Sequence, residues 1–487
     1  MSENLESLSH DPRDLEQFRK YGHQLIDWIA DYHSHPENFP VLSQRQPGDI
    51  QKQLPDEAPQ QAESLDQILK DAEDIVVPGM THWNHPGFMA YFSVSGSPTG
   101  LLGELMAAAF NVNAMLWKTS PAATELEQVV LDWLRKAFGF PETFFGAIHD
   151  TASTSTLIGL IAAREAVAEV DVRKKGLSDG PPLCVYISDQ THSSVEKAAI
   201  IVGVGQDYVR TIPSDDEFRM DINALEAAIK ADVESGHRPF VVVPTIGTTS
   251  TTSADDVEAV ADLAEKYNLW LHVDAAYAGP LAMLPEMRHH FAGCERADSY
   301  VTNAHKWLFT QIGCSILYCS KPDVLKRALS LVPEYLKTQE EDEVVNYMDY
   351  GVALGRRFNA LKLWFVLRSF GVEGLQALWR KHLEMAQQLR RWVEAHPDFE
   401  MLAPTPFSVV CFRAKPSDWS GSENALDELN NQLMHAVNRA GKVFFSHTRL
   451  KGHLTLRMAI GHLYMETHHV QTAWEAVTKE LQHLLKK

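Results

Sequence analysis

The sequence lacks the features of a membrane-spanning, secreted or zinc-binding protein. Its first residues, MSENLESLSHDPRDLEQ, contain no apolar stretch, and no part of the chain approaches 18 uninterrupted apolar residues. Neither a secretion signal nor a membrane-spanning helix is therefore predicted. The chain has only five cysteines, at Cys184, Cys294, Cys314, Cys319 and Cys411. They are too few and too irregularly spaced for a disulfide framework, and none forms a CxxC pair, so we expect a cytoplasmic protein without a metal site.

An excess of basic residues is also missing. The chain has 44 Lys and Arg against 64 Asp and Glu, which gives a net charge of −20. A nucleic-acid-binding surface needs a basic stripe to displace counterions from phosphates, and an anionic membrane would repel so acidic a chain. We therefore expect neither nucleic acid nor a membrane among its partners.

Two common enzyme motifs are incomplete. Gly203 and Gly205 lack the third glycine of a dinucleotide-binding fingerprint. The segment GLSDG at 176–180 precedes a strand-like run, whereas the serine of a nucleophile elbow follows a strand. The sequence therefore predicts neither a dinucleotide site nor a serine nucleophile at these positions.

The N-terminal region, residues 1–97, is predicted to be a helical segment. Apolar residues from Leu15 to Tyr32 repeat with the 3.6-residue period of a helix, and Asp11 and Pro12 precede them as a start signal. Residues 37–61 hold four prolines among polar side chains, which indicates an extended surface segment. A second helical segment is expected from about Ser64.

Residues 98–372 are predicted to form a large α/β domain. Apolar runs alternate there with amphipathic helical segments; the runs are LCVYIS at 183, FVVVPTIG at 240, LWLHVD at 269, SYVTN at 299 and CSILYC at 314. Strands that are apolar nearly throughout are typical of a mostly parallel sheet covered by helices on both faces.

Residues 373–487 are predicted to form a small α+β domain. The pattern gives a helix from Glu373 to about Ala395, a strand at FSVVCF (407), a helix between Ser422 as N-cap and Gly441, a strand at LTLRMAI (454) and a last helix.

Three polar signals stand at the ends of elements in the α/β region. Hydroxyl residues from Thr151 precede a helix, where backbone N–H groups can hold a phosphate, although a plain N-cap would look the same. Asp274 ends an apolar strand, where a carboxylate can meet a cationic ligand or merely cap a turn. Lys306 ends another strand beside Trp307 and Leu308, so it is either a solvated charge or a partly desolvated amine that can act as a nucleophile.

Together these three signals match the needs of an enzyme that uses pyridoxal 5′-phosphate (PLP). The lysine would bind the cofactor covalently, the carboxylate would keep the pyridine nitrogen protonated, and the helix N-terminus would hold the phosphate.

At these residues the chain resembles the group II PLP-dependent decarboxylases, most of all the aromatic L-amino acid decarboxylases. The resemblance runs over nearly the whole chain and rests on PGMTHWNHPGFMAYF, SPAATELE, DTAS, SDQTHSSVEKA, GTTSTTS, HVDAAYAG, NAHKWL, YLK and GRRFNALKLWFVLRSFGVEGLQ. It implies an aspartate aminotransferase-like fold (fold type I) for the large domain. It also implies a homodimer with the active site at the interface.

The resemblance implies a role for each matching residue. Lys306 would carry the PLP, Asp274 would pair with the pyridine nitrogen, and His192 would stack on the ring. Tyr335, in YLK, falls on a loop tyrosine associated with protonation of the substrate Cα. The other cofactor positions are Ala152, Ser153, Thr249, Asn303 and His305.

The implied substrate pocket is largely aromatic and apolar. It comprises Trp83, Tyr91, Phe92, Ser93 and Val94 from one segment, Asn113 and Met115 from the partner subunit, and Gly355. Such walls suit an aromatic side chain. Gly355 leaves room for a bulky ring, while Val94 lacks the hydroxyl that animal aromatic decarboxylases have there.

The expected reaction is decarboxylation of an aromatic L-amino acid (tryptophan, tyrosine, phenylalanine, DOPA or 5-hydroxytryptophan) to its amine and CO₂. One rival is an aldehyde synthase that couples decarboxylation to oxidative deamination; it tends to change the loop tyrosine or the stacking histidine, and both are present here. Another rival is a decarboxylase of a non-aromatic, acidic amino acid, which would need a cation in the pocket. The third is a catalytically dead binding partner, against which the intact set of active-site residues argues.

Overall fold

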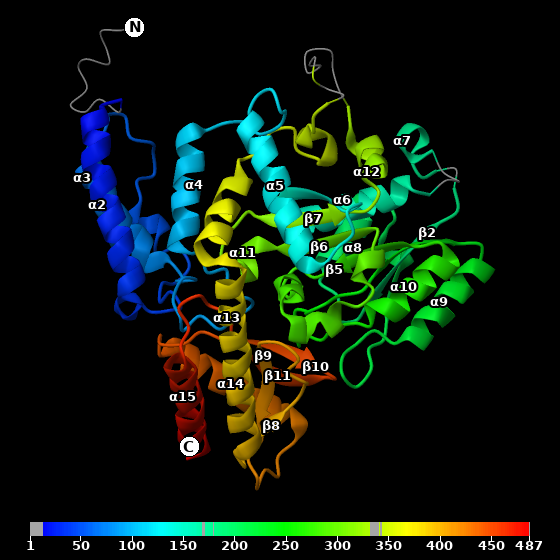
Figure 1. Ribbon diagram of the computed structural model, residues 1–487. Helices are drawn as coiled ribbons and strands as arrows, with labels where there is room; N and C mark the ends of the chain where they lie inside the picture. The colour runs from blue at the N-terminus through cyan, green and yellow to red at the C-terminus, as the bar shows by residue number, and fades with distance from the viewer. Residues whose placement is uncertain (1–12, 168–170, 179, 332–339, 341–342, 487) are drawn as a thin grey trace.

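A mixed sheet of seven strands forms the centre of the large domain (Figure 1). The computed structural model describes residues 13–167, 171–178, 180–331, 340 and 343–486. The strand order is β1-β7-β6-β5-β4-β2-β3, and β7 runs antiparallel to both of its neighbours while the other pairs are parallel. The strands are β1 Phe145–His149, β2 Leu183–Ser188, β3 Val209–Ile212, β4 Arg238–Val243, β5 Trp270–Asp274, β6 Ser299–Asn303 and β7 Ser315–Cys319. The prediction of a mostly parallel sheet is therefore confirmed.

Helices cover both faces of this sheet, which is why its strands are apolar nearly throughout. The helices of the large domain are α4 Pro98–Phe110, α5 Pro121–Phe138, α6 Ala152–Glu165, α7 Val172–Lys175, α8 Ser194–Ile201, α9 Ile222–Glu234, α10 Val257–Tyr267, α11 Ala304–Trp307 and α12 Pro322–Leu329. On β2, Val185 packs in one hydrophobic core with α6, α8 and α12, and the next residue, Tyr186, packs in another with α5, α9 and α10. The two-residue period of a strand thus supplies both cores.

The small domain is built on a second, antiparallel sheet below the first in Figure 1. Its strand order is β10-β11-β9-β8, with β8 Phe399–Met401, β9 Val409–Ala414, β10 Ser446–Leu450 and β11 His453–Ala459. Helices α14 (Glu423–Arg439) and α15 (Thr467–Leu485) pack with this sheet around a separate core. The predicted helix signals are confirmed for α14: the Ser422 side chain accepts a hydrogen bond from the N–H of Ala425, and Gly441 has a φ of +78°.

A long helix, α13 (Asn359–Ala395), joins the two sheets. It is interrupted at Gly371, whose φ of 64° and ψ of 171° are not helical. The expected helix from Glu373 is the part of α13 beyond this break. The domain boundary that the sequence suggests at 372 lies next to the break, and the division into three domains stays a prediction.

The N-terminal helices α2 (Leu15–Ser34) and α3 (Leu65–Asp71) stand at one side of the molecule (dark blue in Figure 1). Asp14 caps α2 by accepting hydrogen bonds from the N–H groups of Glu16 and Gln17, at 2.9 and 3.2 Å. The start signal expected at Asp11 and Pro12 lies outside the described residues. No residue of α2 is buried. Across the described part of the chain, we find no helix with the length and apolar character needed to cross a membrane.

Candidate active site

The predicted nucleophile, Lys306, lies in the one-turn helix α11, which follows β6 directly. Its neighbours Trp307 and Leu308 are fully buried, and its Nζ stands 5.0 Å from the centre of the Phe92 ring. Burial lowers the pKa of Lys306 from 10.5 to about 8; the negative charge of Asp274 opposes this shift and the positive charge of Arg457 adds to it. The predicted desolvation of Lys306 is thus confirmed, and about a quarter of such an amine would be neutral at pH 7.5.

The predicted carboxylate, Asp274, is the last residue of β5, beside β6 in the sheet. Its side chain is 4% exposed, and one carboxylate oxygen accepts a hydrogen bond from the N–H of Ala276 at 3.0 Å. Because neighbouring parallel strands end at the same edge of a sheet, the residues that follow β4, β5 and β6 gather there. Asp274 and the segment that carries Lys306 therefore meet at this edge.

The predicted phosphate cradle is the start of α6. Thr151 is its N-cap, and the Thr151 hydroxyl accepts a hydrogen bond from the N–H of Thr154. The first N–H groups of a helix have no partner inside the helix, so the N–H groups of Ala152 and Ser153 are available to an anion. The amide oxygen of Asn303, at the end of β6, is buried without a hydrogen-bond partner among the described residues.

Two histidines lie at the same place. The Nδ1 of His305 lies 3.0 Å from the backbone oxygen and 3.1 Å from the backbone nitrogen of Cys314, and burial lowers the pKa of His305 to about 4. The Nδ1 of His192 accepts a hydrogen bond from the N–H of Ser194 at 3.2 Å, and burial is the main cause that lowers the pKa of His192. In a neutral ring whose Nδ1 is an acceptor, the proton sits on Nε2. The His192 ring therefore carries a donor on the Nε2 edge.

One cavity of about 220 Å³ brings these residues together. All eight predicted cofactor contacts line it: Ala152, Ser153, His192, Thr249, Asp274, Asn303, His305 and Lys306. We call it the Lys306 cavity. It holds one cation, one carboxylate and a set of N–H donors at a helix start, so it can bind a molecule that carries a phosphate, a protonated ring nitrogen and an electrophilic carbon.

The predicted substrate residues are distributed differently. Phe92 lines the Lys306 cavity, but the other seven predicted positions, Trp83, Tyr91, Ser93, Val94, Asn113, Met115 and Gly355, are not among its lining residues. The Trp83 and Tyr91 rings stack on each other at 5.9 Å, and the side chains are 39% and 53% exposed. Asn113 lies elsewhere, beside Gly355, and accepts a hydrogen bond from the N–H of Arg356 at 2.9 Å. Tyr335 lies outside the described residues.

Five further residues line the Lys306 cavity that the sequence analysis did not single out: Ser194, Thr245, Gly247, Ala276 and Tyr277. Thr245 follows β4 closely, so the rule that strand ends gather at one edge could have found it. Tyr277 stacks on Phe92 at 3.8 Å between ring centres and on Trp307 at 4.4 Å. No local pattern signals this stack, because its members come from distant parts of the chain.

Arg457 of β11 is another buried charge at this site. Its guanidinium lies 4.8 Å from the centre of the Phe92 ring and donates hydrogen bonds to the backbone oxygens of Thr249 and Ser250, at 2.9 and 3.1 Å. It also donates to the backbone oxygen of Tyr91. Arg457 thus ties the small domain to two loops beside the Lys306 cavity.

Away from this cavity, Cys184, Asp232 and His237 form the one cluster of potential metal ligands found in the described ranges. Arg210 already pairs with it: its guanidinium donates to Asp232 at 2.6 Å and lies 3.4 Å from the Nδ1 of His237. Because a cation fills the charge requirement of Asp232, the cluster is a structural ion pair.

Comparison with known proteins gives matches over most of the chain. Residues 47–415 match the model of the pyridoxal-dependent decarboxylase conserved domain. The chain is 43% identical to a phenylacetaldehyde synthase of Arabidopsis thaliana, over 98% of each protein. It is also 43% identical to tyrosine decarboxylase 3 of Petroselinum crispum, over 96% of this chain and 93% of that protein. The crystal structure of Oryza sativa TDC with PLP and tryptamine superposes with a TM-score of 0.94 at 38% identity, covering 98% of this chain and all of that one.

Proposed function

This chain belongs to the family of pyridoxal-dependent decarboxylases, and on that premise we propose that it converts an aromatic L-amino acid into its amine and CO₂. The observation that carries the proposal is the Lys306 cavity, in which a desolvated lysine, a strand-end carboxylate and a helix start face one space. The aromatic substrate class is supported by the relatives, since the similar proteins are a tyrosine decarboxylase, a phenylacetaldehyde synthase and a structure that holds tryptamine.

The residues of the Lys306 cavity fit the cofactor of the family, PLP. The start of α6 offers free N–H groups for a phosphate, and the buried amide oxygen of Asn303 and hydroxyl of Thr245 have no partner among the described residues. Buried polar groups of this kind are normally hydrogen-bonded, so a polar ligand is expected to satisfy them. When bound, the cofactor supplies a protonated pyridine ring that accepts the electron pair released as CO₂ leaves.

Each residue then has a distinct task. Lys306 binds the cofactor through its neutral amine, which a pKa of about 8 makes available near neutral pH. Asp274 holds the proton on the pyridine nitrogen, because a carboxylate at 4% exposure strongly favours a nearby cation. His192 lines the same cavity, where it would stack on the cofactor ring and would offer its Nε2–H to the substrate carboxylate. The Ala152 and Ser153 N–H groups, with His305, orient the phosphate and so fix the ring.

Protonation of the substrate Cα completes the reaction. We assign this proton to the hydroxyl of Tyr335, on the basis of the YLK motif. If this hydroxyl delivers the proton, the product is the amine. Without it, O₂ can oxidise the electron-rich carbon and is itself reduced to hydrogen peroxide, and hydrolysis by water then gives the aldehyde and ammonia. The similarity to a phenylacetaldehyde synthase makes the aldehyde route the second candidate function.

A homodimer that completes the substrate side is part of this proposal. Seven of the eight predicted substrate residues do not line the Lys306 cavity of their own chain, so a second copy can supply some of them. Helix α4 exposes a row of large apolar side chains, Leu102, Leu105, Met106 and Phe110, each at least 44% exposed. Such a row favours an interface with another protein surface. A cytoplasmic location stays a prediction.

The proposal is tested with purified, PLP-loaded protein and a panel of aromatic and acidic L-amino acids. CO₂, amine, aldehyde and peroxide are followed together for each substrate. We expect amine and CO₂ in equal amounts from at least one aromatic amino acid. Formation of aldehyde and peroxide would favour the second candidate function. Turnover of acidic substrates alone would refute the aromatic pocket. No turnover of any substrate, with PLP bound, would favour a binding role.

A further inference from the structure

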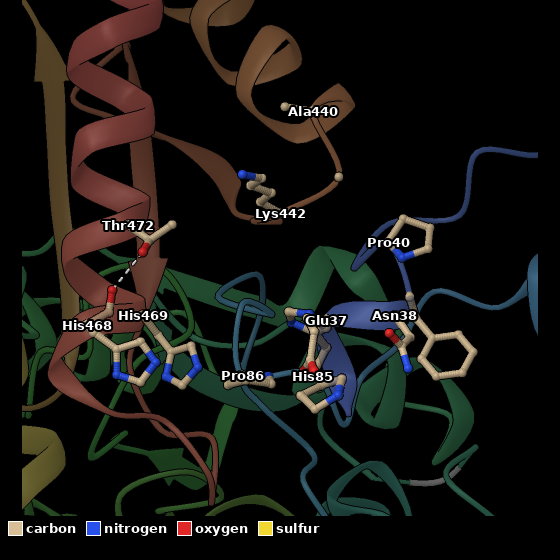
Figure 2. Close-up of a pocket in the computed structure, with 13 residues that line it drawn as sticks. Glu37, Asn38, Pro40, His85, Pro86, Ala440, Lys442, His468, His469 and Thr472 are labelled. Atoms are coloured by element: carbon tan, nitrogen blue, oxygen red, sulfur yellow. Dashed lines mark hydrogen bonds between the residues drawn. The ribbon is translucent and has the colours of Figure 1, made fainter. Parts of the chain in front are cut away.

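A second and larger cavity lies between the N-terminal segment and the small domain (Figure 2). It has a volume of about 540 Å³ and shares no lining residue with the Lys306 cavity. We call it the His85 cavity. Its walls come from the short helix Pro36–Asn38 and the residues after it, the loop at His85, the turn that follows α14, and the first turns of α15. Small-molecule sites commonly have volumes of about 300–1,000 Å³.

Two histidines offer hydrogen-bond donors to the His85 cavity. The Nδ1 of His85 accepts a hydrogen bond from the N–H of Gly87 at 2.8 Å, and the Nδ1 of His469 accepts one from the N–H of Glu466 at 3.0 Å. Burial lowers the pKa of His85 to about 4 and also lowers the pKa of His469, so both rings are neutral near pH 7. Each neutral ring therefore carries its proton on Nε2, the edge that does not face its own backbone.

Lys442 adds a full positive charge to the same cavity. It is exposed, and it makes no hydrogen bond or ion pair with any other described residue. Figure 2 shows its side chain leaving the turn after α14, with His468 and His469 on α15. The chain as a whole is negatively charged, with a net charge of −20, so this unpaired lysine gives the cavity a local positive charge. Anions are repelled at long range by such a chain, so binding would depend on these short-range contacts.

The acidic groups near the cavity already have partners. Glu37 lies 3.4 Å from the Nδ1 of His35, and its side chain is 70% exposed. Glu466 pairs with Lys381. Glu37 lines the His85 cavity as a solvent-exposed carboxylate and Asn38 as an amide, so the groups that can attract an anion there are Lys442 and the Nε2–H groups of His85 and His469.

The walls of the His85 cavity are fixed by backbone hydrogen bonds between distant segments. The N–H of Val41 donates to the oxygen of Gly441 at 2.8 Å, and the N–H of Phe444 donates to the oxygen of Gly87 at 3.0 Å. Phe39 and Pro86 supply apolar wall surface. A site whose walls are held in place loses little conformational entropy on binding.

We propose that the His85 cavity binds a small organic anion, a carboxylate or a phosphate monoester that carries an apolar ring. The anionic group is held by Lys442 and by the Nε2–H groups of His85 and His469, and the ring lies against Phe39 and Pro86. The site is separate from the reacting centre, so this inference does not depend on the identity of the amino-acid substrate.

The experiment is calorimetric titration of the PLP-loaded enzyme with phenyl phosphate and, in a second arm, phenylacetate. Bound PLP occupies the phosphate cradle of the Lys306 cavity, and benzyl alcohol serves as the uncharged probe. The variants are Lys442→Glu, which reverses the charge, and His468→Ala, which removes an imidazole that makes no side-chain hydrogen bond in the described structure. Lys479→Glu makes the same charge change on the exposed side of α15 and is the matched control.

We expect saturable binding of at least one anionic probe and none of benzyl alcohol. Lys442→Glu should weaken that binding by about tenfold or more, while His468→Ala, which removes none of the proposed contacts, and Lys479→Glu stay within about twofold. The stronger probe tells whether a phosphate or a carboxylate fits. Absence of saturable binding by both anions, or equal binding by Lys442→Glu and the control, would refute the proposal.

Discussion

The cofactor side and the substrate side of the active site differ in how far one chain completes them. All eight predicted cofactor contacts line the Lys306 cavity, whereas Phe92 alone of the eight predicted substrate contacts does so. The cofactor side is built from strand ends and a helix start of one sheet, which a single chain fixes by itself. The substrate side is built from loops around 83–94, 113–115 and 355. This difference supports our proposal that one chain binds the cofactor and that a second copy completes the substrate side.

The largest effect is expected from removing the cofactor-side nucleophile. Lys306→Ala should abolish the visible absorbance of covalently bound PLP and lower kcat by at least about 10,000-fold, because no other amine lines the Lys306 cavity in the described chain. The absorbance spectrum and the rate of CO₂ release measure the two losses. Lys321→Ala is the control, since that lysine pairs with Asp298 at the surface and is 54% exposed. Survival of the absorbance band would show that another lysine binds the cofactor.

The next largest effect is expected from Asp274, and it distinguishes the contribution of this carboxylate from those of the other cofactor contacts. Asp274→Asn should lower kcat by about 100- to 1,000-fold at saturating PLP, because an amide cannot hold the proton on the ring nitrogen by charge. The measurement is kcat at PLP concentrations that restore full occupancy, so that weaker cofactor binding is separated from slower chemistry. Asp189→Asn, at an exposed position, should change kcat by less than about twofold. An Asp274→Asn enzyme with normal kcat would remove Asp274 from the mechanism.

A hybrid dimer tests the substrate side directly. Gly355→Phe fills the space beside Asn113 and should be nearly inactive alone, as should Lys306→Ala. When equal amounts of the two variants are refolded together, about half of the dimers are hybrids. Each hybrid has one intact site, with Lys306 from one chain and Gly355 from the other, so about a quarter of the wild-type activity should return. Size-exclusion chromatography verifies that the mixture is dimeric. If no activity returns although hybrids form, Gly355 serves the site of its own chain and the comparison drawn above is wrong.

The expected effect of Tyr335 is on the product more than on the rate. Tyr335→Phe should lower the yield of amine by about tenfold and produce aldehyde with peroxide, because the proton for Cα is missing. Amine, aldehyde and peroxide are quantified together on the preferred substrate. Tyr267→Phe removes a surface hydroxyl that donates to Glu226 on the neighbouring helix and should leave the product ratio unchanged. An unchanged amine yield in Tyr335→Phe would contradict the proton-donor role.

The same comparison explains what could be predicted from the sequence. Asp274 and Lys306 could be assigned because each ends an apolar run, and parallel strands bring such ends to one edge. The bounds of α14 followed from Ser422 and Gly441, whose side chain and positive φ act locally. For β10 the sequence SHTRL gave no apolar signal, since an edge strand is only partly buried and its side chains are mostly polar.

Contacts between distant segments could not be predicted from local patterns. Arg457 donates to the backbone of Tyr91 across 366 positions of sequence, and nothing in LTLRMAI distinguishes it from a surface arginine. The Phe92, Tyr277 and Trp307 stack likewise exists only once the sheet and the loop at 92 are in place. The family resemblance supplied the residues of the substrate side, but their arrangement depends on packing that a single sequence does not encode locally.

The smallest effect tests the electrostatics of the cofactor side. Apo-protein should take up PLP faster as the pH rises, because only the neutral amine of Lys306 attacks the aldehyde and burial has lowered its pKa to about 8. With that pKa, the rate at pH 9 should be about fourfold the rate at pH 7.5 and should change little above pH 9. Stopped-flow absorbance follows the uptake, and pyridoxine 5′-phosphate, which has no aldehyde, should bind without this pH dependence. A midpoint near the ordinary lysine pKa of 10.5 would mean that the Lys306 cavity is open to water in the apo-protein. A midpoint near 8 would mean that one chain alone already provides the desolvation that the cofactor side requires.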